Sequence, residues 1–79
     1  MIYTIATMTE CRENPLTLEI GKKGNKYTVC LGRHGDWTCQ TFDSLEEAYK
    51  VFEKASSWLI MGLYPEAAKR HFVKTGTMA

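Results

Sequence analysis

The sequence lacks the residue patterns by which an enzyme or a metal site is usually recognised. Its three cysteines and two histidines show none of the close pairings that build a zinc site. Cys30 and His34 are the only local Cys–His candidates, but a predicted turn separates them, so they do not form an activated nucleophile. Glu46 and Glu47 are adjacent on a predicted helix and therefore point in different directions. We expect no catalytic residue, no metal and no cofactor.

Strong charge of one sign and long apolar runs are missing as well. Ten basic and nine acidic residues give a formal charge of +1, whereas phosphate binders are usually strongly basic and nucleic-acid mimics strongly acidic. No apolar run approaches the roughly 20 residues that span a bilayer. Residues 1–8 also lack the positive start of a signal peptide. We therefore expect no contact with a membrane.

The cysteine count bears on the compartment. Cys11, Cys30 and Cys39 are an odd number without a CxxC pair, which fits a reducing compartment better than a secreted disulfide scaffold. We expect a cytoplasmic protein.

Length and composition fit one small domain. The chain has 79 residues, of which 44% are apolar and 24% charged. This is enough to build one modest core, so we expect a single domain over residues 1–79.

Alternating apolar and polar side chains predict three or four antiparallel strands. The candidate strands are residues 2–8, 16–20, 26–32 and 36–42, with a polar loop at 9–15. Pairing Ile20 with Tyr27 across a turn at 21–25 aligns the apolar side chains on one face. The position of the first strand in the sheet is left open by the sequence.

The second turn decides the register of the last two strands. A three-residue loop at 33–35 with Gly35 in the left-handed conformation sets Val29 opposite Cys39, apolar against apolar. This register leaves Cys30 and Cys39 on opposite faces of the sheet. A slip by one residue would set Val29 opposite Gln40 and would allow a disulfide, so we expect no disulfide here.

The outer face of the predicted sheet is polar but poor in charge. Its members are Thr17, Glu19, Thr28, Cys30, Thr38 and Gln40. We expect this face to be open to solvent, as is common for an antiparallel sheet, with partner pairing as the alternative.

Two helices follow the strands. Ser44 and Glu47 have the spacing of a capping box, and Gly62 is placed to end the long helix in the left-handed conformation. The apolar stripe consists of Leu45, Ala48, Tyr49, Phe52, Ala55, Ser56, Leu59 and Leu63. A short helix is expected from Pro65 to about Val73, followed by a frayed tail. The fold class is thus α+β, a small antiparallel sheet with one long helix packed across one face and a short C-terminal helix.

Apolar residues outside the stripe are the first candidates for a binding surface. Val51, Trp58, Ile60 and Met61 lie off the stripe, so that the second half of the long helix, residues 55–63, is apolar nearly all round. A helix of this kind is usually buried all round. Either the short helix covers these residues or another chain does, as a homodimer or as a partner protein.

Basic residues form the second set of candidates. Lys22, Lys23, Lys26 and Arg33 flank the two hairpin turns, and Lys69 and Arg70 lie on the short helix. Such clusters could contact a nucleic-acid backbone. The turns of a meander lie at opposite ends of the sheet, and no aromatic residues are interleaved with the basic ones, as platforms for single strands require.

One family resemblance is visible. Lys-Tyr-Thr-Val at 26–29 followed by Phe-Asp-Ser-Leu-Glu-Glu-Ala at 42–48 resembles the strand, strand, helix core of HicB-type antitoxins. The match covers under half of the chain. The chain lacks the strand segment with Gly and Pro that is typical of that family, so no function is carried over.

By elimination, shape and apolar contact are left as the means of action. We expect a small non-enzymatic protein-binding module, of the kind that phages and mobile elements use as inhibitors or regulators, anti-CRISPR and other anti-defence proteins included. The alternative is a nucleic-acid-binding regulator that uses the basic turns and the short helix. A third hypothesis is an enzyme or thiol sensor centred on Cys30 or Cys39.

Overall fold

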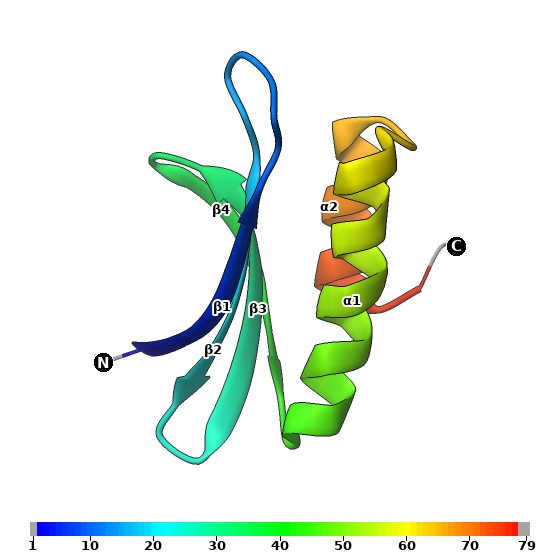
Figure 1. The fold of residues 1–79 in the computed structure, drawn as a ribbon. Coiled ribbons are helices and arrows are strands. Elements are labelled where there is room, and N and C mark those ends of the chain that lie inside the picture. Colours follow the sequence, from blue (N-terminus) through cyan, green and yellow to red (C-terminus); the bar gives the residue numbers. More distant parts are fainter. Residues whose placement is uncertain (1, 78–79) are drawn as a thin grey trace.

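The computed structural model describes residues 2–77, and the end of the predicted tail at 78–79 lies outside them. The elements are β1 (Ile2–Thr9), β2 (Thr17–Lys23), β3 (Lys26–Arg33), β4 (Asp36–Phe42), α1 (Leu45–Met61) and α2 (Glu66–Thr75). Both helices lie on one side of the sheet (Figure 1). The predicted α+β class is confirmed.

The sheet is a simple antiparallel meander. Its strand order is β1-β2-β3-β4, which places β1 at one edge and β4 at the other. Both helices contact β3 and β4, and α1 also contacts β2. The core is formed between β2, β3 and the two helices.

The first hairpin is longer than predicted. β2 continues to Lys23, and only Gly24 and Asn25 form the turn, with Lys23 paired to Lys26. Ile20 therefore lies opposite Val29, and the predicted pair with Tyr27 is wrong. The shift is by two residues, and since side chains alternate with a period of two, the apolar side chains still share one face.

The second hairpin has the register that the sequence argument rejected. The turn has two residues, His34 and Gly35, and Gly35 has the expected positive φ of 80°. Val29 lies opposite Gln40, not Cys39. Cys30 lies directly opposite Cys39 and forms a disulfide with it. The predicted absence of this disulfide is therefore wrong.

The short helix supplies the physical reason for this register. Thr38 and Gln40, predicted on the outer face, point toward α2. The Thr38 hydroxyl accepts from Arg70 Nη1 at 2.9 Å. Gln40, with its amide nitrogen turned toward the helix, donates to the carbonyl oxygens of Val73 (2.7 Å) and Lys74 (3.2 Å). Because these polar groups find partners on α2, they can lie on the buried side.

The caps of α1 are as predicted. Ser44 accepts a hydrogen bond from the Glu47 amide at 3.2 Å, and Gly62 ends the helix with φ 68° and ψ 28°. The buried face of α1 differs from the predicted stripe, because it includes Val51 and Trp58. Its members are Ala48, Val51, Phe52, Ala55, Trp58 and Leu59. Leu45, Tyr49 and Leu63 of the predicted stripe are exposed.

The short helix α2 extends two residues beyond the predicted end at Val73, and Gly76 caps it in the left-handed conformation. Phe72 and Val73 are buried. The Phe72 ring lies 4.7 Å from the Trp58 ring, centroid to centroid. The helix therefore covers one flank of α1, and its other flank, toward β1, has no helix beside it in the described chain.

Candidate protein-binding surface

A buried acid organises the end of β1. The Glu10 side chain is 4% exposed. Its Oε1 accepts from the Leu16 amide at 2.9 Å, while the Glu10 amide donates to the Leu16 carbonyl at 2.9 Å. Glu10 thus holds the two ends of the β1–β2 loop together through hydrogen bonds from its main chain and to its side chain.

Lys69 on α2 compensates the charge of this acid. Its Nζ lies 3.4 Å from Glu10 Oε2, and its side chain is 6% exposed. Arg12 lies farther away, with its Nε 4.0 Å from Oε1. A buried carboxylate needs such partners, because burying an unpaired charge is costly. Lys69, predicted as part of a basic surface, is thus buried in an ion pair.

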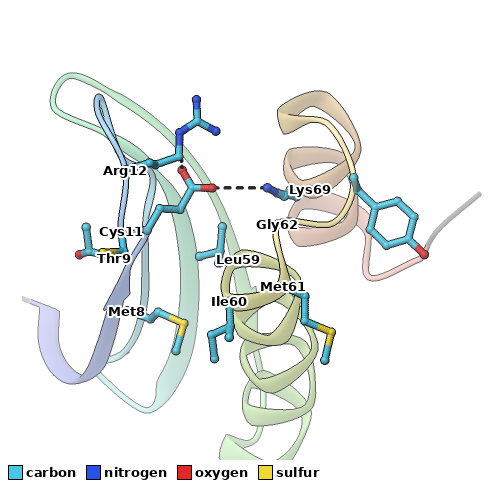
Figure 2. Close-up of a pocket in the computed structure, with 11 residues that line it drawn as sticks. Met8, Thr9, Cys11, Arg12, Leu59, Ile60, Met61, Gly62 and Lys69 are labelled. Carbon is cyan, nitrogen blue, oxygen red and sulfur yellow. Dashed lines mark hydrogen bonds and ion pairs between the residues drawn. The ribbon is translucent and has the colours of Figure 1, made fainter.

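A groove lies beside this ion pair, between the end of β1 and the C-terminal end of α1 (Figure 2). Its volume is about 510 Å³. The lining residues are Met8, Thr9, Glu10, Cys11, Arg12, Leu59, Ile60, Met61, Gly62, Tyr64 and Lys69. Apolar side chains from strand and helix form its walls, and the Glu10–Lys69 pair forms its polar end.

Two apolar side chains of the groove are largely in solvent. Ile60 is 71% and Met61 is 68% exposed. Adjacent large apolar residues at this exposure, beside a groove, are typical of a surface that another molecule covers. Met61 was a predicted binding residue. Ile60 belongs to the same apolar set of the helix, but it was not among the predicted binding residues.

Val51 and Trp58, the other apolar candidates, lie in the core. They are 8% and 5% exposed. The Trp58 ring packs between those of Phe72 and Tyr64, at centroid distances of 4.7 and 4.8 Å. Phe72 of the short helix and Tyr64 of the segment before it therefore cover Trp58, while Met61 stays open.

The basic residues of the first hairpin lie together at one end of the sheet. Lys26 forms an ion pair with Asp43, and this hydrogen bond lowers the pKa of Asp43. Lys22 lies over the Tyr27 ring, 5.8 Å from its centroid. Lys22 and Lys23 are exposed. One of the three positive charges is thus offset by an acid.

Arg33 and Arg70 belong to a network that joins α2 to the sheet. Arg33 Nη1 lies 2.9 Å from Glu66 Oε1, and Arg70 Nε lies 2.9 Å from Glu66 Oε2. Arg70 Nη2 also reaches Asp36 Oδ2 at 3.1 Å. Hydrogen bonds from the two guanidinium groups, that of Arg33 first, lower the pKa of Glu66. These two arginines therefore face protein acids, and the structure does not join them to the lysines of the first hairpin.

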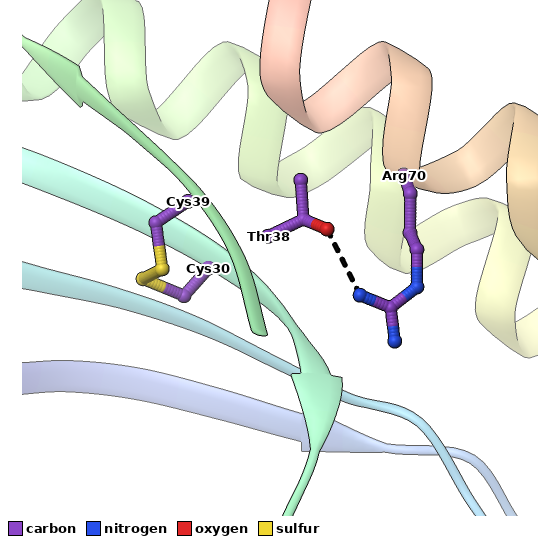
Figure 3. The surroundings of a disulfide bond; sticks show 4 residues. All are labelled: Cys30, Thr38, Cys39 and Arg70. Atoms are coloured by element: carbon purple, nitrogen blue, oxygen red, sulfur yellow. Dashed lines mark hydrogen bonds between the residues drawn. A yellow bond between two sulfur atoms is a disulfide. The ribbon is translucent and has the colours of Figure 1, made fainter. Parts of the chain in front are cut away.

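The cysteines lie on two different surfaces. The Cys30–Cys39 disulfide is on the face of the sheet away from the helices, opposite to the Thr38–Arg70 contact (Figure 3). Cys11 is a free thiol that lines the groove. Among residues 2–77, no three His, Cys, Asp or Glu side chains come together as a metal site would require.

Neither helix in the described part of the chain is long and apolar enough to cross a membrane.

Comparisons with known proteins found no match: no family model, no curated protein and no solved structure is significantly similar to this chain. The HicB resemblance of residues 26–48 is therefore not supported by a family match.

Proposed function

We propose that this protein is a non-enzymatic binding module that holds another protein in the groove between β1 and α1. The observation that carries the proposal is the pair of adjacent apolar residues, Ile60 and Met61, exposed beside the groove. Burying two such side chains contributes about 1.5–3 kcal/mol each. That is enough to make them the centre of a binding surface.

The partner's chemistry follows from the groove's two ends. An apolar side chain would enter between Met8 and Ile60, where strand and helix supply apolar walls. Arg12, whose side chain is 63% exposed, stands at the polar end and suits an acidic or carbonyl group of the partner. An inhibitor or regulator from a phage or mobile element, such as an anti-CRISPR protein, remains the narrower form of this proposal.

The experiment is capture of partners from a nuclease-treated lysate of the source cells with tagged protein. We compare wild type with Ile60→Asp and Met61→Asp, since a carboxylate at either position opposes apolar contact while the exposed site tolerates it in the fold. Tyr49→Asp is the matched control, because Tyr49 is a large exposed residue of the same helix that does not line the groove. Circular dichroism checks that all four proteins are folded.

Loss of one stoichiometric protein in both groove variants, with retention by Tyr49→Asp, is the expected result. Equal capture by all four proteins would refute the groove as the binding surface.

The nucleic-acid alternative rests on Lys22 and Lys23 at the first hairpin. If the protein binds nucleic acid there, Lys22→Ala/Lys23→Ala weakens binding, and added salt weakens it steeply, because each phosphate contact releases counterions. Capture that disappears with nuclease would favour this alternative.

The cytoplasmic location stays a proposal to be tested on the Cys30–Cys39 pair. Disulfides persist in oxidising compartments and are usually reduced in the cytosol. Thiol labelling in intact cells would find both cysteines reduced in the cytoplasm, and a pair that resists labelling until reductant is added would contradict that location.

A further inference from the structure

β1 exposes one side of its main chain. It lies at the edge of the sheet, so only β2 pairs with it among the described residues. In an antiparallel ladder, pairs that exchange hydrogen bonds alternate with pairs whose main-chain groups point away. The Glu10 amide bonds to Leu16, so Thr9, opposite Thr17, and Thr7, opposite Glu19, direct their amides and carbonyls to the free edge.

This edge has little of the protection that edge strands usually carry. Proteins commonly block such edges with lysine, proline or inward charges. β1 has the sequence IYTIATMT, with no charged residue and no proline, whereas each of the other three strands contains at least one charge. A bulge at Ile5 is the one protective feature in the pairing with β2. Tyr3 is 74% and Ile5 is 47% exposed.

The opposite edge of the sheet is better guarded. β4 begins with Asp36, whose carboxylate and carbonyl both bond to Arg70, at 3.1 and 3.3 Å. Asp43 follows its last residue. Two charges at the ends of β4 and a helix packed along it leave β1 as the edge that can accept a strand.

We propose that β1 pairs antiparallel with β1 of a second copy of this chain, giving a two-fold dimer with one continuous sheet. Antiparallel pairing of identical strands is self-complementary, and a strand without charge meets no like charge in any register of that pair. Each copy thereby supplies the other's missing main-chain partners at Thr7 and Thr9. With β4 guarded, the assembly closes as a dimer and does not extend into a fibre.

The proposal does not rest on the groove. The groove proposal is carried by the side chains of Ile60 and Met61 on α1, while the pairing uses the main chain of β1, including that of Thr9, whose side chain also lines the groove. A monomeric protein would therefore refute the dimer and leave the capture experiment unaffected.

The test is sedimentation equilibrium of the full chain over a range of concentrations, with substitutions on the two edges. Thr7→Pro removes an amide that points to the free edge and takes no part in the β1–β2 ladder, and Thr7→Lys adds a charge there without changing the main chain. Thr41→Pro and Thr41→Lys are the matched controls. Thr41 in β4, which lies opposite Thr28 of β3, is also exposed and also directs its amide to a free edge.

We expect wild type to sediment at twice the chain mass of 9.0 kDa. Both Thr7 variants should weaken the dimer at least about tenfold, which corresponds to roughly 1.4 kcal/mol. The Thr41 variants should dissociate as wild type does. Wild type at 9.0 kDa at every concentration, or equal effects at Thr7 and Thr41, would overturn the proposal. If circular dichroism shows that Thr7→Pro is unfolded, the comparison of Thr7→Lys with Thr41→Lys decides whether β1 forms the dimer.

Amide hydrogen exchange of the unmodified chain provides an independent readout. In the dimer the amides of Thr7 and Thr9 are bonded to the second copy and exchange slowly, whereas those of Cys39 and Thr41, on the free edge of β4, exchange fast. Fast exchange at all four positions would also overturn the proposal.

Discussion

At the scale of single residues, local contacts could be predicted and distant ones could not. Ser44 and Glu47 are three residues apart, so a helix cap is readable from their spacing. Glu10 and Lys69 are separated by 59 positions, and only the fold brings them together. Each one alone looks like a solvated charge, since most Glu and Lys are exposed.

The buried pair makes a sharp prediction about stability. Lys69→Met removes the partner 3.4 Å from a buried carboxylate, so we expect it to lower the free energy of unfolding by about 3–5 kcal/mol. Adding Glu10→Gln removes the stranded charge. The double variant should therefore be more stable than Lys69→Met alone.

Urea unfolding of wild type, both single variants and the double variant measures this coupling. Lys50→Met is the control, because Lys50 forms an exposed pair with Glu46 and should change stability by less than about 1 kcal/mol. Additive effects at Glu10 and Lys69 would show that the two residues do not interact.

Gly32 makes a second prediction at this scale. A Cβ at Gly32 would lie 2.0 Å from the Asp36 carbonyl oxygen and 2.8 Å from Trp37 Cα. Replacing a strand glycine by alanine normally stabilises by about 0.5–1 kcal/mol. Here we expect Gly32→Ala to destabilise by about 1–3 kcal/mol, because the main chain of β4 must move. Thermal unfolding shows whether Gly32→Ala is less or more stable than wild type. A more stable variant would contradict the observed register.

At the scale of elements, the sequence predicted the strands and helices better than their pairing. Apolar periodicity predicts that β3 and β4 are strands. It also favours a register in which Val29 lies opposite an apolar residue, Cys39, whereas the structure has Val29 opposite Gln40. The register is instead set by α2, where Arg70 and the last carbonyls bond Thr38 and Gln40. A strand's pattern does not show that a helix far along the chain offers polar partners on its buried side.

The disulfide across β3 and β4 leads to a prediction for this hairpin. Cys30 and Cys39 are nine positions apart, and closing so short a loop in the unfolded chain stabilises the fold by about 2–3 kcal/mol. Cys30→Ser/Cys39→Ser should lower the free energy of unfolding by that amount, and Cys11→Ser should not. Non-reducing peptide mapping that finds another pairing would refute the register.

The stability that the attachment of α2 to the sheet provides should depend on pH. Arg33 and Arg70 lower the pKa of Glu66 from its ordinary value of 4.5. A carboxylate with a lowered pKa in the folded state stabilises at pH values above its ordinary pKa, and the contribution is lost as the pH falls below that value. Wild type should therefore exceed Glu66→Gln in stability at pH 7, with a difference that shrinks below about pH 4.5.

Thermal unfolding of wild type and Glu66→Gln between pH 7 and pH 3 measures this difference in stability. Glu53→Gln is the control for the loss of one negative charge, because Glu53 is an exposed carboxylate on α1. A difference between wild type and Glu66→Gln that stays constant down to pH 3 would contradict the role given to Glu66.

At the scale of the whole molecule, one question left open by the sequence has an answer. The second half of α1 is apolar nearly all round, so either α2 or another chain had to cover it. α2 covers Trp58 and leaves Ile60 and Met61 exposed, because it packs on only one flank of α1. The other flank and β1 enclose the groove, which no periodicity in the sequence could locate.

The central claim is that this groove is where the protein meets its partner. The most direct measurement is amide hydrogen exchange of the chain, alone and bound to the protein it captures. We predict that binding slows exchange at residues 8–12 and 59–64, which line the groove or adjoin it, while residues 22–26 are unchanged. Protection confined to residues 22–26 would contradict the claim and move the binding surface to the lysine-rich hairpin.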